Sequence, residues 1–133
     1  MTRLPRHDDA PILIVDDDLD IREALVETLE DMGFPVVTAA HGSEALALLR
    51  HTPVLPSLIL LDLMMPVMDG YRFWEELRRD PELASIPVAI ITAGHGVDRS
   101  RLGQGIHILP KPINVPRLLT VVRGLRATSA SGS

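Results

Sequence analysis

A chain of 133 residues has room for one domain with a substantial core, but not for two. Its composition, with 46% hydrophobic and 23% charged residues, is that of a folded globular protein and excludes an intrinsically disordered one. The net charge of -5 argues against a nucleic-acid-binding surface, and the absence of cysteine excludes disulfides and thiolate metal sites.

The N-terminal part of the chain predicts a buried strand followed by a helix. Residues 1–10 offer few apolar anchors and are expected to form a disordered tail. The apolar run in "APILIVDD" is typical of a buried parallel strand that ends at Asp16. Apolar residues then recur at helical spacing as far as Gly33, which is a typical helix stop.

The same alternation of strand and helix continues along the chain. We predict strands at 35–40, 57–62, 86–92 and 106–109, and helices at 42–51 (opening at Ser43), 69–80 and 114–126. Alternation of this kind favours parallel strands joined by right-handed crossovers. The expected fold class is therefore α/β, a doubly wound five-stranded parallel sheet with helices on both faces. The domain should span residues 11–127, and residues 128–133 should form a disordered C-terminal tail.

One segment interrupts this regularity. Residues 93–105 hold four glycines and few apolar residues at the place where a fourth helix should lie. We therefore expect the fourth helix to be short or irregular.

Polar side chains follow four of the predicted strands. Asp16 and Asp17 follow the first strand, Asp62 ends the third, Thr92 ends the fourth, and Lys111 follows the fifth in the turn "LPKP". Ligands of open α/β sheets bind outside the carboxyl ends of the strands, so these groups are expected to converge there. Lys111 is also the only lysine of the chain.

Carboxylates packed together repel each other unless a cation relieves them or their pKa values rise. Oxygen ligands without His or Cys suit Mg²⁺ or Mn²⁺, and Mg²⁺ commonly accompanies phosphate. A threonine hydroxyl and a lysine ammonium can both bind phosphoryl oxygens. The group therefore indicates a metal-dependent phosphoryl site at which a carboxylate could form an aspartyl-phosphate.

Four motifs appear in order along residues 11–127: "ILIVDDD", "LLDLMMPVMDG", "PVAIITA" and "LPKP". With them the sequence resembles the receiver domain of response regulators in bacterial two-component systems. The resemblance implies a flavodoxin-like fold and a phosphorylation-dependent signalling switch. It also implies that a histidine kinase or a histidine phosphotransfer protein supplies the phosphoryl group.

The resemblance carries over residue by residue. Asp62 would be the phosphoacceptor, and Thr92 and Lys111 would bind the phosphoryl group. Mg²⁺ or Mn²⁺ would be held by Asp16, Asp17, Asp62 and the backbone carbonyl of Met64. The peptide bond before Pro112 would be cis.

The sequence departs from the family pattern in two places. Ile108 occupies the position at which receivers usually carry a switch aromatic, and an isoleucine cannot show the same two-state ring movement. The stretch between Thr92 and Lys111 is also short for the family. Our hypothesis is that phosphorylation changes the order of residues 93–105 instead of flipping an aromatic ring.

We interpret the chain as a stand-alone receiver without an output domain, and not as an enzyme beyond its own phosphorylation and dephosphorylation. It should be cytoplasmic, contact neither nucleic acid nor membrane directly, and act on a downstream protein that the sequence does not identify. Two alternatives stay open. One is a receiver-like interaction module that is never phosphorylated. The other is a phosphatase of the haloacid dehalogenase type, although such enzymes need a second acid where this chain has Met64.

Overall fold

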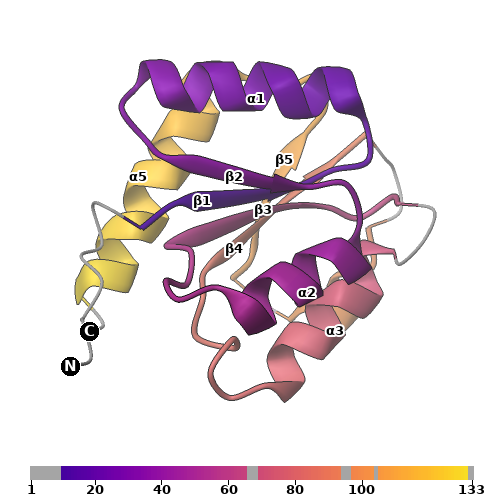
Figure 1. Cartoon of the computed structure of the whole chain (residues 1–133). Helices are drawn as coiled ribbons and strands as arrows, with labels where there is room; N and C mark the ends of the chain where they lie inside the picture. The colour runs from indigo at the N-terminus through magenta and orange to yellow at the C-terminus, as the bar shows by residue number, and fades with distance from the viewer. Residues whose placement is uncertain (1–9, 66–68, 94–96, 104, 132–133) are drawn as a thin grey trace.

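The architecture is a single parallel sheet with helices on both sides (Figure 1). The structure is a computed structural model that describes residues 10–65, 69–93, 97–103 and 105–131. The strands are β1 (Ile12–Val15), β2 (Val36–Ala39), β3 (Leu58–Asp62), β4 (Val88–Thr92) and β5 (His107–Pro110). They pair in the order β2-β1-β3-β4-β5, and every pairing is parallel.

Helices cover both faces of this sheet. They are α1 (Leu19–Asp31), α2 (Gly42–His51), α3 (Gly70–Arg79), α4 (Arg99–Leu102) and α5 (Val115–Ser131). Helices α1 and α5 lie on one face, and α2 and α3 lie on the other (Figure 1). The predicted doubly wound fold is confirmed, and so is the short fourth helix, because α4 has only four residues.

The continuous apolar runs of the sequence become strands that are buried on both faces. Leu13 and Val15 of β1 pack into the core under α2 and α3, whereas Ile12 and Ile14 pack into the core under α1 and α5. All four side chains have no exposed surface. A strand covered on both sides needs apolar residues at every position, which explains why these segments do not alternate with polar residues.

Both ends of the predicted domain need correction. Ala10 was assigned to the N-terminal tail, but it is 4% exposed and its carbonyl accepts a hydrogen bond from Ser57 Oγ at 3.3 Å. The predicted disordered tail is also wrong for the backbone of residues 128–131, which continues α5 to Ser131. Residues 125–131 contain no proline or glycine, so nothing in this part of the sequence forces the earlier stop. Residues 1–9 and 132–133 lie outside the described residues.

The start of α2 also differs from the prediction. Ser43 was expected to open the helix, but the residue that caps it is His41, whose Nδ1 accepts the backbone N–H of Glu44 at 3.2 Å. Glu44 in turn accepts the N–H of Ala40 at 2.9 Å. The His41 imidazole thus takes the capping position usually held by Ser, Thr, Asp or Asn, and Glu44 binds the N–H of the residue before the cap.

This cap leads to a prediction for stability. Replacing His41 with alanine removes the nitrogen that accepts the backbone N–H of Glu44. His41→Ala should therefore lower the free energy of unfolding by about 1 kcal/mol. Denaturant titrations of the wild type and the variant measure this. Ser43→Ala is the matched control, and a larger loss from Ser43→Ala than any effect at His41 would contradict the assignment.

The single turn of α4 is attached to α3 by polar and ring contacts. The Tyr71 hydroxyl accepts the backbone N–H of Asp98 at 2.6 Å, and Trp74 Nε1 donates to the carbonyl of Arg101 at 3.2 Å. Arg101 also pairs with Glu75 at 2.9 Å and stacks on the Tyr71 ring at 4.4 Å from its centroid. Side chains of α3 therefore position a helix that is too short to be stable alone.

Among the residues that the structure describes, no helix is both long enough and apolar enough to cross a bilayer.

Candidate functional site

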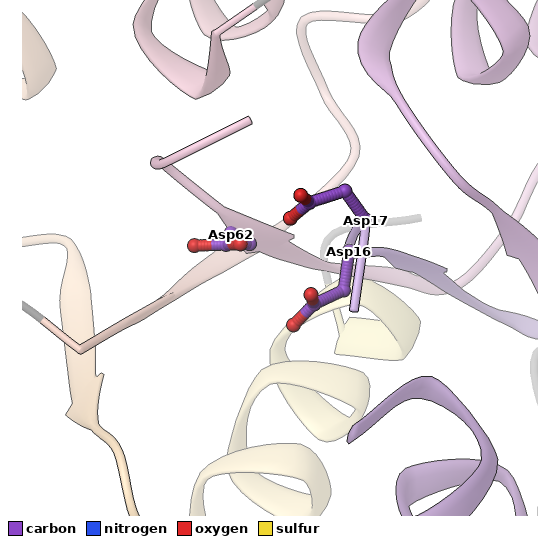
Figure 2. A group of neighbouring side chains, drawn as sticks. All are labelled: Asp16, Asp17 and Asp62. Atoms are coloured by element: carbon purple, nitrogen blue, oxygen red, sulfur yellow. The ribbon is translucent and has the colours of Figure 1, made fainter. Parts of the chain in front are cut away.

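Three carboxylates gather where β1 and β3 end (Figure 2). Asp62 is the last residue of β3, and Asp16 and Asp17 directly follow β1, its neighbour in the sheet. One oxygen from each carboxylate lies within 4.8 Å of the other two. Asp16 and Asp62 are buried, with 1% and 2% of their surface exposed, whereas Asp17 is exposed. The predicted convergence of these three residues is therefore present in the fold.

Lys111 reaches the same place from the loop after β5. Its Nζ lies 3.1 Å from Asp16 Oδ2 and 3.5 Å from Asp62 Oδ2. The backbone N–H of Lys111 donates to the carbonyl of Thr92 at 2.9 Å, which attaches this loop to the end of β4. The Lys111–Pro112 peptide bond is cis, as the family resemblance implies. A single ammonium therefore bridges two buried carboxylates.

Asp62 is electrostatically unfavourable as a carboxylate in this setting. Burial is the main cause that raises the pKa of Asp62, and the nearby charge of Asp16 raises it further. The backbone N–H of Met64, which donates to Asp62 Oδ1 at 3.1 Å, and the Lys111 ammonium act in the opposite direction. The balance leaves the pKa of Asp62 at about 6. A further positive charge at this place would favour the ionised form.

The surroundings of Asp16 and Lys111 also carry more negative than positive charge. Burial by itself would lower the pKa of Lys111, but the carboxylates of Asp16 and Asp62 outweigh this effect and raise the pKa. Asp16 Oδ1 accepts the N–H of Asp18 at 2.9 Å. The buried Asp16 Oδ2 has the Lys111 ion pair, but it accepts no well-aligned hydrogen bond within the described residues. One ammonium does not neutralise three carboxylates. The carboxylates offer only oxygen ligands, which fit a hard divalent cation such as Mg²⁺.

The remaining predicted site residues lie on the strands β4 and β5 and just after β3. Thr92 ends β4 and is 3% exposed, and β4 pairs with β3 so that Ile91 lies opposite Asp62. Met64 contributes its backbone N–H, which donates to Asp62, whereas the residue as a whole is 68% exposed. Ile108 lies in β5, is half-buried and packs against the core on the α3 side. The position of the family's switch aromatic is therefore filled by an aliphatic side chain that already contacts the core.

Gly70 supports the site, although the sequence indicated only a turn at this place. It is the first residue of α3, and its N–H donates to the carbonyl of Leu63 at 2.9 Å. A Cβ at this position would lie 2.5 Å from both the Asp62 carbonyl oxygen and Leu63 Cα. Only glycine therefore allows α3 to start directly against the backbone that carries Asp62. The Asp-Gly pair in "MDG" was the one sequence signal that could have pointed to this contact.

This contact predicts that Gly70→Ala will destabilise the protein. The Cβ would meet backbone atoms, which cannot move aside as a flexible side chain can, so we expect a loss of about 2 kcal/mol in the free energy of unfolding. Gly124→Ala in α5 is the matched control, because a Cβ there meets nothing within 4 Å and should stabilise the helix by about 0.5–1 kcal/mol. Thermal or denaturant unfolding of both variants measures the difference. Equal effects at the two positions would contradict the close approach.

Known proteins resemble this chain along most of its length. A family model described as the response regulator receiver domain matches residues 12–123. The response regulator Rre1 of Synechocystis is 39% identical over 128 residues, which cover 92% of this chain and 54% of that protein. A CpxR homologue of Haemophilus influenzae, named a transcriptional regulatory protein, is 38% identical and covers 92% of this chain and 52% of its own length. The chain thus spans about half the length of these curated relatives.

Solved structures agree with the family match. The chemotaxis protein CheY4 of Vibrio cholerae superposes with a TM-score of 0.77 at 32% identity, covering 87% of this chain and 98% of that protein. A CheY-like receiver domain protein of Methanospirillum hungatei superposes with a TM-score of 0.82 at 26% identity, covering 93% and 98% of the two chains. Both matches include nearly all of the solved chain.

Proposed function

This chain belongs to the response regulator receiver domain family, and on that premise we propose that it accepts a phosphoryl group on Asp62. Members of this family act in general as signalling switches that histidine kinases phosphorylate. The observation that carries the proposal is the buried Asp62 carboxylate, with two acidic neighbours and Lys111 Nζ 3.5 Å away. A histidine kinase or a histidine phosphotransfer protein would be the donor.

The proposed transfer is a displacement at phosphorus. An Asp62 carboxylate oxygen attacks the phosphorus of a phosphohistidine, a P–O bond forms, and the P–N bond breaks with the electron pair leaving on the imidazole. Lys111, already within reach of Asp62 Oδ2, neutralises charge on the phosphoryl oxygens. The hydroxyl of Thr92, at the end of the neighbouring strand, supplies a hydrogen bond to the same group.

We propose Mg²⁺ or Mn²⁺ as the cofactor. Asp16, Asp17 and Asp62 would hold it, together with the backbone carbonyl of Met64, and it would supply positive charge for the phosphoryl oxygens. The fit is supported by the raised pKa of Asp62 and by the poorly satisfied Oδ2 of Asp16.

The first experiment is intact mass spectrometry after incubation with a small acyl-phosphate donor and Mg²⁺. The wild type should gain the mass of one phosphoryl group, whereas Asp62→Asn and a chelator-treated sample should gain none. If the wild type also gains nothing and binds no beryllofluoride, the chain is better described as an interaction module that is not phosphorylated. If it turns over a phosphate ester repeatedly, the phosphatase alternative is supported.

We further propose that phosphorylation acts on α4, because Thr92 ends β4 only seven residues before that helix begins. Within the predicted stretch 93–105, the structure describes residues 93, 97–103 and 105. We propose the change for residues 97–103, which include α4. Amide hydrogen exchange with and without beryllofluoride and Mg²⁺ measures the order of this part. Unchanged exchange in Val97–Gly103, together with saturated beryllofluoride binding, would refute this mode of signalling.

A further inference from the structure

A groove of about 850 Å³ lies on the side of the molecule that carries α3 and α4. Its walls come from the C-terminal half of α3, from the segment that leads into β4, and from α4 with Gly103, Gly105 and Ile106. Val88, the first residue of β4, and Ile106, directly before β5, both line it. The groove therefore lies where these strands begin, at the opposite end of the sheet from Asp62.

The groove lies beside α4, which is a single turn. Ser100, Arg101 and Leu102 of this helix line it. The apolar part of the lining includes Trp74, Ile86 and Val88. Its volume is within the range of about 300–1,000 Å³ that is typical of ligand-sized sites, which suits a few side chains rather than a whole domain.

The charge of the groove is opposite to that of the protein. The chain carries a net charge of -5, yet the ionisable residues that line the groove are three arginines and one glutamate. The glutamate, Glu75, already pairs with Arg101 at 2.9 Å. Two cationic side chains, Arg78 and Arg79, therefore remain on the α3 wall.

Neither of these two arginines is strongly engaged. Arg78 stacks on the Trp74 ring at 5.4 Å from its centroid, and in the described part of the chain it pairs with no carboxylate. Arg79 pairs with Glu76 at 3.3 Å, but its side chain is 75% exposed, and exposed pairs of this kind contribute little. Both guanidinium groups can therefore turn toward an anionic group in the groove at little cost.

We propose that this groove is a docking site for an acidic segment of a partner protein. An apolar side chain of the segment would lie against Trp74, Ile86 and Val88, and its carboxylates would pair with Arg78 and Arg79. A nucleic acid fits less well, because the acidic chain would repel a polyanion and only two cations are available. No residue that lines the groove belongs to the carboxylate group, so binding at the groove can be tested on the unphosphorylated protein.

The test begins with selection of binders from a displayed library of random peptides on the wild-type protein. Selected peptides are synthesised and titrated while the emission of Trp74, the only tryptophan of the chain, is recorded. We expect peptides rich in Asp and Glu with an apolar residue, a saturable change in Trp74 emission, and weaker binding at high salt. Arg78→Gln with Arg79→Gln should weaken binding at least tenfold.

The matched control is Arg50→Gln with Arg123→Gln, which removes the same charge from exposed positions on α2 and α5. It should leave peptide binding unchanged, and circular dichroism should show both double variants folded. The proposal is overturned if no peptide is selected, if the selected peptides are neutral or basic, or if both double variants bind them equally. Tighter binding of a single-stranded oligonucleotide at the same arginines would also overturn it.

Discussion

Asp62→Asn should stabilise the protein by about 3 kcal/mol near pH 8 in the presence of a chelator. The reason is that burial and the charge of Asp16 raise the pKa of Asp62 from 3.8 to about 6, so the ionised form is disfavoured in the folded state. Each unit of pKa shift corresponds to about 1.4 kcal/mol. Asparagine keeps an oxygen that can accept the Met64 N–H but carries no charge.

The pH dependence gives the sign of this effect. Between the unfolded pKa of 3.8 and the folded pKa of about 6, the folded wild type binds more protons than the unfolded chain. Its free energy of unfolding therefore falls as the pH rises through this window, and the penalty is complete above it. Asn does not titrate, so the difference between the two proteins should be largest near pH 8 and vanish below about pH 4.

Urea titrations of both proteins across this pH range measure the difference, since carboxylates far from Asp62 contribute equally to both proteins. Adding Mg²⁺ near pH 8 should stabilise the wild type more than Asp62→Asn, because the variant has lost one of three carboxylates. A variant that is less stable than the wild type near pH 8 without metal would show that Asp62 is not held in an unfavourable ionised form.

Lys111→Met should have the opposite effect and destabilise the protein by about 3 kcal/mol near pH 8 without metal. Methionine replaces the aliphatic stem, but it removes the ammonium that lies 3.1 Å from Asp16 and 3.5 Å from Asp62. Two buried carboxylates would then face each other without a counter-charge. The loss should shrink when Mg²⁺ is added, because the cation would replace part of the missing charge.

A double-mutant cycle separates this effect from a loss of packing. In the Asp62→Asn background only one buried carboxylate remains beside position 111, so Lys111→Met should cost clearly less than in the wild type. Arg123→Met, at an exposed position on α5, serves as the control and should change stability little. An equal loss in both backgrounds would mean that Lys111 contributes by packing alone.

Much of the site could be predicted from the sequence because parallel sheets collect strand ends at one edge. The apolar runs before Asp16, Asp62 and Thr92 were long and unmixed enough to identify buried strands, and each polar residue stood directly after or at the end of one. The single lysine between two prolines was visible in the same way. The fit of four motifs then added the family and an expected role for each residue.

Local capping and close approach were harder to predict. The sequence favoured Ser43 as the start of α2 because serine is a common cap, whereas His41 takes that position in the fold. Gly70 looked like an ordinary turn glycine, and its contact with the Asp62 carbonyl depends on how α3 meets β3. Such contacts depend on backbone direction, which the order of residues alone does not give.

By itself the sequence determined the succession of strands and helices, the burial of the strands and the identity of the groups at their ends, since these follow from apolar pattern and residue type. Only the tertiary structure decided the distances among those groups, and with them the pKa of Asp62, because an electrostatic interaction depends on separation and burial. It also decided that a groove lies beside the one-turn α4 and the side chains of Arg78 and Arg79, because that space is bounded by segments far apart in the chain.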